Sequence, residues 1–239
     1  MTTALTIRYI AFGLYFTSFV YMLILGASQF IKKFRSTEES NSLGNINISE
    51  KMSIINEWAE SADSYEEIPN HSKRVAEIAR QIGERYGLSS EELESLECAA
   101  LLHDIGQVNN FEFIKEPREL ELGEKIELEE HPIIGEDQAK QISGIGSAPL
   151  WIRWHHEKWD GTGYPEQLSG EMIPLPVRIL TLADSYDSLT HDRPHSPAIS
   201  TEEAIATIQS LAGIKFDPNV VQVFTSIESE PDVGINFEV

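Results

Sequence analysis

The residues from His155 to Pro165, with the sequence HHEKWDGTGYP, combine several groups that bind metal ions. Two adjacent imidazoles and two carboxylates precede a turn rich in Gly and Pro. Neighbouring side chains on a helix point roughly 100° apart, so His155 and His156 suit two metal ions better than one. Upstream, the pair His103–Asp104 ends an apolar run and offers a terminal nitrogen beside a carboxylate able to bridge two ions. These residue types and spacings predict a metal site.

Further motifs lie on both sides of these two segments. In order, they are Glu67 with His71, the HD pair His103–Asp104, His131-Pro132 with Gly135, Gly163-Tyr164-Pro165, Arg178-Ile179-Leu180, Ala183-Asp184-Ser185-Tyr186-Asp187, Asp192-Arg193-Pro194 and Phe216-Asp217-Pro218. In these motifs the chain resembles the HD-GYP phosphodiesterases, a branch of the HD metal-dependent phosphohydrolases named for the HD pair and the GYP triplet. The resemblance extends from about Met52 to Phe224 and is specific, because so many motifs agree in one order.

The resemblance implies a centre of two or three divalent metal ions, of iron or manganese. Its implied ligands are Glu67, His71, His103, Asp104, His131, His155, His156 and Asp184. Mixed imidazole and carboxylate ligands without thiolates also argue against a structural zinc site. Asp104 would bridge a pair of ions, and a water between them would ionise to hydroxide, the nucleophile that attacks phosphorus. Glu67 would help to hold a third ion.

Two aspartates of one predicted helix have different expected roles. Asp184 follows an apolar run, where an unpaired carboxylate would be costly to bury. Metal coordination removes that cost. Asp187, one turn later, could cap the helix, brace a neighbouring side chain or orient a metal ligand, and a structural role is expected. His191 and His195 fall outside the motifs, so we expect surface or structural roles for them.

The family's usual substrate is cyclic di-GMP, which is opened to linear pGpG or cut to GMP. The resemblance implies catalytic roles for His103, Asp104 and Gln107, and substrate contacts for Gln107, Tyr164 and Arg193. The GYP turn is expected to contribute shape more than chemistry, because its glycines permit backbone angles closed to other residues. Within the family this turn is also linked with partner recognition, so a diguanylate cyclase or a sensor protein is an expected partner.

Three departures from the family's pattern affect phosphate-facing or stacking positions. Gln107 stands where a lysine commonly follows the HD pair, and His195 and Ser196 stand where an aromatic and a basic residue are common. Two alternatives to an active cyclic di-GMP phosphodiesterase therefore stay open. One is a catalytically weak metal-binding module that acts as a nucleotide receptor or scaffold, and the other is a phosphohydrolase for another phosphodiester.

Helical periodicity predicts the elements that position these residues. Gly87 is typical of a helix C-terminus, and Ser89 or Ser90 followed by three glutamates predicts the start of the helix that leads to the HD pair. Amphipathic stretches lie at residues 54–58 and 75–82, and further helices are predicted at Glu124–Gln141, Pro149–His156, Pro176–Leu189, Thr201–Leu211 and Pro218–Thr225. No run is typical of a β-sheet. The predicted fold class is all-α, and the resemblance implies the helical bundle of an HD domain.

The stretch from Tyr9 to Ile31 has no formal charge. At 1.5 Å per residue, its roughly 23 residues cross a hydrocarbon core of about 30 Å, which predicts one N-terminal transmembrane helix. Arg8 precedes it, and basic residues follow at positions 32, 33 and 35, so the positive-inside rule places the rest of the chain in the cytoplasm, against the inner membrane. A cleaved signal peptide and a buried helix are the rivals, but a signal peptide has an apolar region of about 7–15 residues and its charge comes first.

The chain thus divides into a membrane anchor at residues 1–35, a polar linker at 36–49, a catalytic domain at 50–228 and an acidic tail at 229–239. The 18 Lys and Arg against 39 Asp and Glu give a formal net charge of −21. Such a surface repels a long polyanion, so polymeric nucleic acid is excluded as a partner. A small anionic cyclic dinucleotide remains compatible, because bound metal ions invert the local potential.

Overall fold

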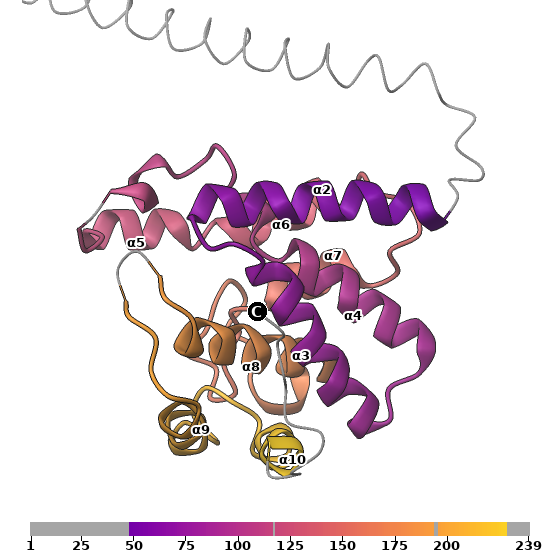
Figure 1. Ribbon diagram of the computed structural model, residues 1–239, viewed down its shortest axis with the longest axis vertical. Helices are drawn as coiled ribbons and strands as arrows, with labels where there is room; N and C mark the ends of the chain where they lie inside the picture. The colour runs from indigo at the N-terminus through magenta and orange to yellow at the C-terminus, as the bar shows by residue number, and fades with distance from the viewer. Residues whose placement is uncertain (1–47, 117, 194–195, 229–239) are drawn as a thin grey trace, which may run out of the picture. The chain divides into compact units, whose positions relative to one another are not determined.

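The computed structural model describes residues 48–116, 118–193 and 196–228 (Figure 1). By compactness the chain divides into the units Met1–Ile48 and Ser49–Val239. The predicted membrane helix, most of the predicted linker and the acidic tail lie outside the described residues. Among the helices that the structure describes, none combines the length and the apolar character needed to cross a bilayer.

The described residues form helices joined by loops, which confirms the all-α prediction for this part of the chain. Here β-pairing is limited to two isolated bridges, Arg193 with Ser196 and Ala212 with Phe216. The α-helices are α2 (Ile48–Glu66), α3 (His71–Tyr86), α4 (Ser90–Leu102), α5 (Leu122–Leu128), α6 (His131–Ala139), α7 (Ala148–Trp154), α8 (Leu175–Thr190), α9 (Thr201–Ser210) and α10 (Pro218–Glu228). Three short 3₁₀ helices are η1 (Ile105–Gln107), η2 (Glu112–Lys115) and η3 (Gly170–Met172).

The predicted signals at the junction of α3 and α4 are confirmed. Gly87 ends α3 with a φ of 84°, a left-handed conformation that glycine adopts at little cost. Ser89 caps α4 by accepting from the amide of Glu92, and the Glu92 side chain accepts from the Ser89 amide in return. This junction determines where α4 begins. It therefore also determines the position of the HD pair, which follows the last turn of α4.

The single helix predicted at Glu124–Gln141 is wrong, because two helices, α5 and α6, occupy this range. Pro132 lies in the first turn of α6, and proline has no amide hydrogen to donate to the carbonyl one turn earlier. A continuous helix would need that bond. The break places His131 at the beginning of α6 rather than in the middle of a long helix.

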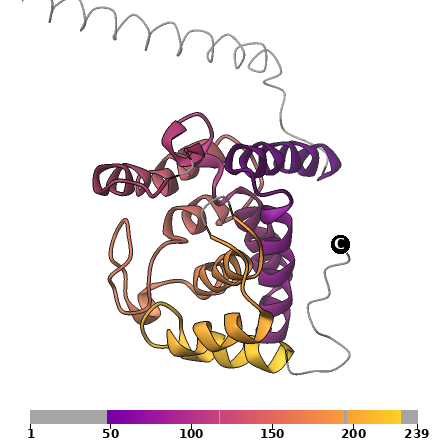
Figure 2. The ribbon, with the colours of Figure 1, turned by 60° about the vertical axis from the view of Figure 1, so that its left-hand side comes forward.

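Around α8, helices α3 and α4 form one side of the bundle, while α9 and α10 lie together at the end away from α2 (Figures 1 and 2). Side chains of Ile78, Leu96, Ile152 and Leu180 are completely buried between these elements. Full burial of such a side chain contributes roughly 1.5–3 kcal/mol. This core holds rigid the helix ends that carry the predicted metal ligands.

Candidate metal centre

The predicted ligands come together from the ends of several helices. His71 and His131 begin α3 and α6, whereas the HD pair follows the last residue of α4. His155 and His156 directly follow α7, and only Asp184 lies within a helix, α8. Four of the five histidines are buried, with His156 partly exposed.

The two carboxylate oxygens of Asp104 face different histidines. Asp104 Oδ1 lies 3.3 Å from His131 Nε2 and 3.8 Å from His155 Nε2. Asp104 Oδ2 lies 2.8 Å from His103 Nε2 and 3.8 Å from His71 Nε2. Potential ligand atoms of Asp104, His131, His155 and His156 lie within 4.8 Å of one another, as do those of His71, His103 and Asp104. Asp104 therefore belongs to both groups, as a bridging ligand must.

Asp184 joins the second group from α8. Its Oδ1 atom lies 3.6 Å from His71 Nε2 and 3.9 Å from His103 Nε2. This position agrees with the argument that coordination would offset the cost of placing a carboxylate after an apolar run.

Each of four histidines is anchored through its Nδ1 atom. His103, His131 and His155 place Nδ1 at 2.8, 2.7 and 2.6 Å from the backbone carbonyls of Ala100, Leu128 and Ile152. A carbonyl only accepts, so Nδ1 carries the hydrogen and Nε2 is left to act as a ligand. Helical geometry produces this arrangement. Each of these three histidines comes just after a helix, and its side chain reaches back to the backbone carbonyl three residues earlier.

Aspartate anchors His71 in the corresponding way. Asp187 Oδ2 lies 2.6 Å from His71 Nδ1, and Asp187 also accepts from Arg74 Nε at 2.5 Å and Nη2 at 2.9 Å. Although burial opposes it, these bonds lower the pKa of the fully buried Asp187 carboxyl to about 2. Asp187 is thus a bracing residue, in line with the expectation from the sequence.

The pKa values of the clustered histidines shift in opposite directions. Burial lowers the pKa of His155 to about 3 and that of His156 well below its usual value, with neighbouring imidazoles adding to both effects. For His103, burial is outweighed by the charge and hydrogen bond of Asp104, which raise its pKa to about 10. Burial would raise the pKa of Asp104, but His103 and His131 hold it well below the usual range.

These donors fit a pair of cations. His71 Nε2 lies 3.3 Å from His103 Nε2, and His131 Nε2 lies 3.3 Å from His155 Nε2. Two neutral nitrogens with lone pairs at this distance repel unless a proton or a cation lies between them. Such a nitrogen and carboxylate set suits iron, manganese or zinc in an open site, and metal binding there would displace the proton at His103.

Glu67 is not at the cluster, contrary to the ligand prediction. It has a φ of 61° and an exposed side chain, whereas the neighbouring Glu66 lines the cavity above the cluster. Burial and the charge of Asp104 raise the pKa of Glu66 well above its usual value, against the opposing charge of Arg193. The left-handed backbone conformation at Glu67, between α2 and α3, leaves Glu66 rather than Glu67 in the cavity lining. The spacing of Glu67 and His71 predicts a ligand only if the backbone between them is a regular helix.

A cavity of about 320 Å³ lies over the cluster. Its polar lining includes Asp104, Asp184 and the predicted substrate-binding residues Gln107, Tyr164 and Arg193, and Ser196 also faces it. Its apolar wall consists of Ile68, Ile114, Leu120 and Leu128. This volume is at the lower end of the ~300–1,000 Å³ typical of small-molecule sites.

The three predicted substrate-binding residues make different contacts. The Gln107 amide donates to Asp104 Oδ1 at 2.7 Å, so it supports the bridging carboxylate. Arg193 Nη2 lies 3.8 Å from Asp184 Oδ1 and 3.4 Å from His71 Nε2. The Tyr164 ring packs on His156 with centroids 4.9 Å apart, and burial raises the pKa of its hydroxyl. His195 lies outside the described residues.

Glu157 closes the loop that carries the GYP triplet, a role that the sequence motifs do not predict. Its buried carboxylate accepts from the amides of Glu166 at 2.7 Å and Leu168 at 3.0 Å. At Gly163, any Cβ atom would collide with backbone atoms of His156, Glu157 and Lys158. Glycine is therefore required here by close backbone approach. The adjacency of Glu157 to the two histidines was the available signal for its importance.

The helical bundle and its clustered His and Asp side chains define an all-α domain that could hold metal ions beneath a cavity. Residues 56–220 match the HD domain family, so the chain belongs to that family.

Relatives agree with this assignment. The chain is 37% identical over 188 residues to a cyclic di-GMP phosphodiesterase of Vibrio cholerae, covering 72% of this chain and 38% of that one. It is 33% identical over 187 residues to a cyclic di-GMP phosphodiesterase of Thermotoga maritima, covering 76% and 50%. A crystal structure of a cyclic GMP-AMP specific phosphodiesterase of V. cholerae superposes with a TM-score of 0.60 at 27% identity, covering 74% and 48%. These relatives support the prediction of a hydrolase, although the chain spans half or less of their length.

Proposed function

We propose that the protein is a metal-dependent phosphodiesterase that hydrolyses cyclic dinucleotides, with cyclic di-GMP as the principal substrate and pGpG or GMP as product. One observation carries this proposal: the two oxygens of Asp104 face two separate groups of histidines at the floor of one cavity. The relatives are named as phosphodiesterases for cyclic di-GMP and for cyclic GMP-AMP, which supports the substrate class.

His71, His103, Asp104 and Asp184 would hold one metal ion, while Asp104, His131, His155 and His156 would hold the other. Of the metals that suit this donor set, we propose iron or manganese. When bound, two such ions activate water as a nucleophile and neutralise charge that develops on phosphorus. No thiolate contributes to this group among the described residues, which separates it from structural zinc sites.

The protein's own residues position the substrate and the ligands. Arg193 brings positive charge to the cavity wall beside Asp184, where a phosphate oxygen would be neutralised. Gln107 holds the bridging Asp104 in place, and Tyr164 covers His156 at the rim. The apolar wall offers a surface for a nucleobase and reduces the access of water to this side of the cavity.

The decisive test uses the chain purified without oxygen, with its metal content quantified, and incubated with cyclic di-GMP or 3′3′-cGAMP while products are separated by chromatography. Linear dinucleotide or mononucleotide from protein with two or more bound metals would support the proposal. Binding without cleavage would instead favour the nucleotide receptor or scaffold, which the missing lysine at position 107 makes the second candidate. If the metal-loaded chain neither binds nor cleaves either nucleotide, another phosphodiester becomes the candidate substrate.

We also propose that residues 9–31 anchor the chain in the inner membrane, with the metal centre on the cytoplasmic side. The uncharged length of this segment and the basic residues after it support the proposal. Membrane fractions containing the full-length chain should retain it through a high-salt wash. Release by salt alone would contradict the anchor.

A further inference from the structure

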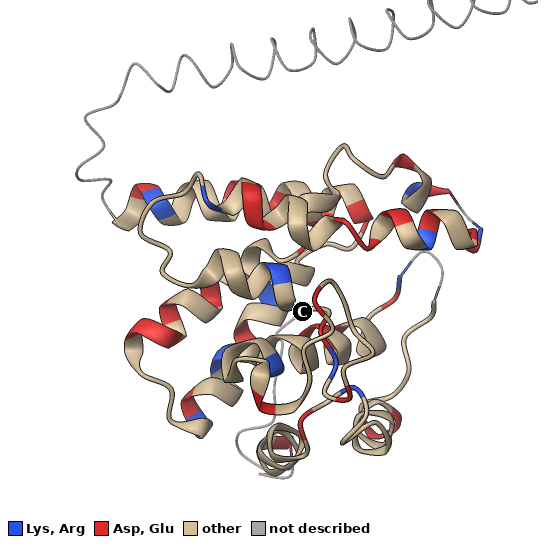
Figure 3. Cartoon of the chain, turned by 180° about the vertical axis from the view of Figure 1, so that it is seen from behind, with Lys and Arg blue, Asp and Glu red and all other residues tan. Residues whose placement is uncertain are grey.

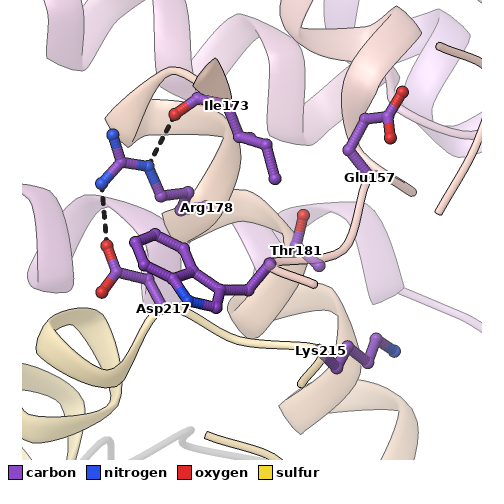
Figure 4. Close-up of a pocket in the computed structure, with 7 residues that line it drawn as sticks. Glu157, Ile173, Arg178, Thr181, Lys215 and Asp217 are labelled. Carbon is purple, nitrogen blue, oxygen red and sulfur yellow. Dashed lines mark hydrogen bonds and ion pairs between the residues drawn. The ribbon is translucent and has the colours of Figure 1, made fainter. Parts of the chain in front are cut away.

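α8 supports histidines of the metal centre from two points along its length. Near its middle, Thr181 donates to the carbonyl of His155 at 2.8 Å, from a crevice that it shares with Arg178 (Figure 4). Near its end, Asp187 accepts from His71 Nδ1. Residues that fix the end of α8 can therefore act on the centre as well.

The carboxylate of Asp187 receives a third side chain besides Arg74 and His71. Asp and Glu are spread over the helices of this acidic chain (Figure 3), and Asp187 is a completely buried member of that set. A buried carboxylate is costly unless donors surround it. His71 and Arg74 both donate to Asp187, and the third group at this carboxylate is the ring of His191.

His191 lies outside the sequence motifs and directly follows the last residue of α8. Its ring is half-buried, with Nδ1 at 3.1 Å from Asp187 Oδ1 and at 3.2 Å from the Asp187 carbonyl oxygen. Both oxygens only accept, so Nδ1 carries a hydrogen. Because Arg74 already supplies positive charge beside Asp187, His191 orients the carboxylate rather than neutralising it.

The same histidine begins the loop that carries Arg193 to the cavity. Arg193 Nη2 lies 3.4 Å from His71 Nε2, the other nitrogen of the ring that Asp187 braces. The far end of the loop is tied to α8, because the Ile199 amide donates to the Leu189 carbonyl at 2.9 Å. His191 holds the near end. The loop therefore acts on both nitrogens of one metal ligand.

We propose that His191 is a positioning residue that acts on the metal ligand His71 through Asp187. It keeps the Asp187 carboxylate in the orientation that holds the hydrogen on His71 Nδ1 and leaves Nε2 as a ligand. It also fixes the start of the loop that presents Arg193 to the substrate. This inference rests on the metal centre and the phosphodiesterase function proposed for the same site. Loss of the His191 ring should weaken metal binding and substrate binding together.

A role limited to capping α8 is the alternative, because His191 Nδ1 also meets a backbone carbonyl at the end of this helix. Capping alone would lower the unfolding midpoint without changing metal affinity. Asn56→Ala is the matched control, since Asn56 Nδ2 donates to the Met52 carbonyl of α2 at 2.8 Å. It removes a similar bond from side chain to carbonyl without touching Asp187, and its metal affinity and KM should equal those of the wild type.

The test measures metal affinity by competition with a chelator, and KM for cyclic di-GMP and 3′3′-cGAMP, in the full-length protein. We expect His191→Ala to weaken metal affinity about three- to tenfold, less than the 10–100-fold typical of a residue bonded directly to a ligand. Its KM should rise severalfold, because the loop of Arg193 loses its anchor.

Two isosteric variants separate the hydrogen bond from the volume of the ring. His191→Asn should stay close to the wild type, since the Asn Nδ2 atom takes the place of Nδ1 and donates. His191→Asp has the same shape but places a carboxylate against Asp187, so it should lose at least as much metal affinity as His191→Ala. If His191→Ala does not fold, the comparison of these two variants decides.

The double variant with Asp187→Asn tests the route through Asp187. If His191 acts through this carboxylate, His191→Ala should weaken metal affinity little further in the Asp187→Asn background, because contacting residues of one network are not additive. Full additivity would overturn the proposal. Wild-type metal affinity in His191→Ala would also overturn it, as would equal affinities of His191→Asn and His191→Asp.

If the wild type binds metal but cleaves neither nucleotide, the phosphodiesterase function fails separately. The metal affinities of the same variants then still decide the role of His191. A wild type that binds no metal would overturn both proposals.

Discussion

At the residue scale, the centre depends on the single Asp104 carboxylate that both groups of histidines share. We expect Asp104→Ala and His103→Ala to reduce metal content and to abolish hydrolysis, because each removes a ligand and leaves buried partners without their hydrogen bond. Elemental analysis and the chromatographic assay measure the two effects. Asp137→Ala, which removes an exposed carboxylate of α6 paired with Lys140, is the control and should change neither. Full activity in both site variants would exclude the proposed centre.

Glu66 and Glu67 form a matched pair of neighbours with opposite surroundings. Because Glu66 lines the cavity and Glu67 is exposed, Glu66→Gln should change metal stoichiometry or KM severalfold, whereas Glu67→Gln should behave as the wild type. Metal analysis and initial rates on both variants decide between the two residues. If Glu67→Gln changed these properties and Glu66→Gln did not, Glu67 would be the metal ligand that the motif spacing implied.

Asp187 reaches the centre through its bond to His71. Replacing it by Asn weakens the bond to His71 Nδ1 and removes the charge that balances Arg74. Loss of such a bracing carboxylate typically costs 10–100-fold in metal affinity. Competition with a chelator should show this loss in Asp187→Asn, while folding by circular dichroism is retained. Unchanged affinity would mean that backbone packing alone orients His71.

At the element scale, the GYP turn has space only for glycine at position 163. Gly163→Ala would force a methyl group against the backbone of residues 156–158 and displace His156. Overpacking of this kind costs about 1–3 kcal/mol, so we expect a lower unfolding midpoint and reduced metal binding. Gly123→Ala in α5, where nothing lies within 4 Å of the added methyl group, should not destabilise the protein. Equal stability of the two variants would contradict the predicted collision.

Helix ends and motif residues were predictable because their signals are local. Gly87 and Ser89 mark a helix end and a helix start through hydrogen bonds to residues within one turn. The clustering of His71 with Asp184, in contrast, was inferred from a family resemblance, since periodicity does not specify which helix ends meet.

The structure differs from the sequence predictions at positions where tertiary packing, rather than local sequence, determines the conformation. A left-handed turn directs Glu66 rather than Glu67 to the cavity, and Pro132 divides a range of helical composition into α5 and α6. Nothing local in the sequence indicates that the loop before α10 meets the segment after the two adjacent histidines. The backbone hydrogen bonds from Trp159 to Lys215 and from Asp160 to Ile214 form only in the packed bundle.

At the scale of the whole molecule, removal of metal should affect stability as well as activity. A ligand that binds only the folded state stabilises it by about 2.7 kcal/mol at a concentration 100-fold above Kd. A chelator should therefore lower the thermal unfolding midpoint of the wild type, as measured by calorimetry. Asp104→Ala should show little further change on chelation; an equal shift in that variant would indicate that the chelator acts elsewhere.

The ligands are distributed along the chain from His71 to Asp184, a separation of 184 − 71 = 113 positions. Ions held by these residues would act as reversible cross-links that close long loops, and closing a loop of this length removes much conformational entropy from the unfolded chain. Metal supply would then govern not only turnover but also how long each copy resists unfolding and proteolysis. Under metal limitation, the abundance of the protein would fall together with its activity.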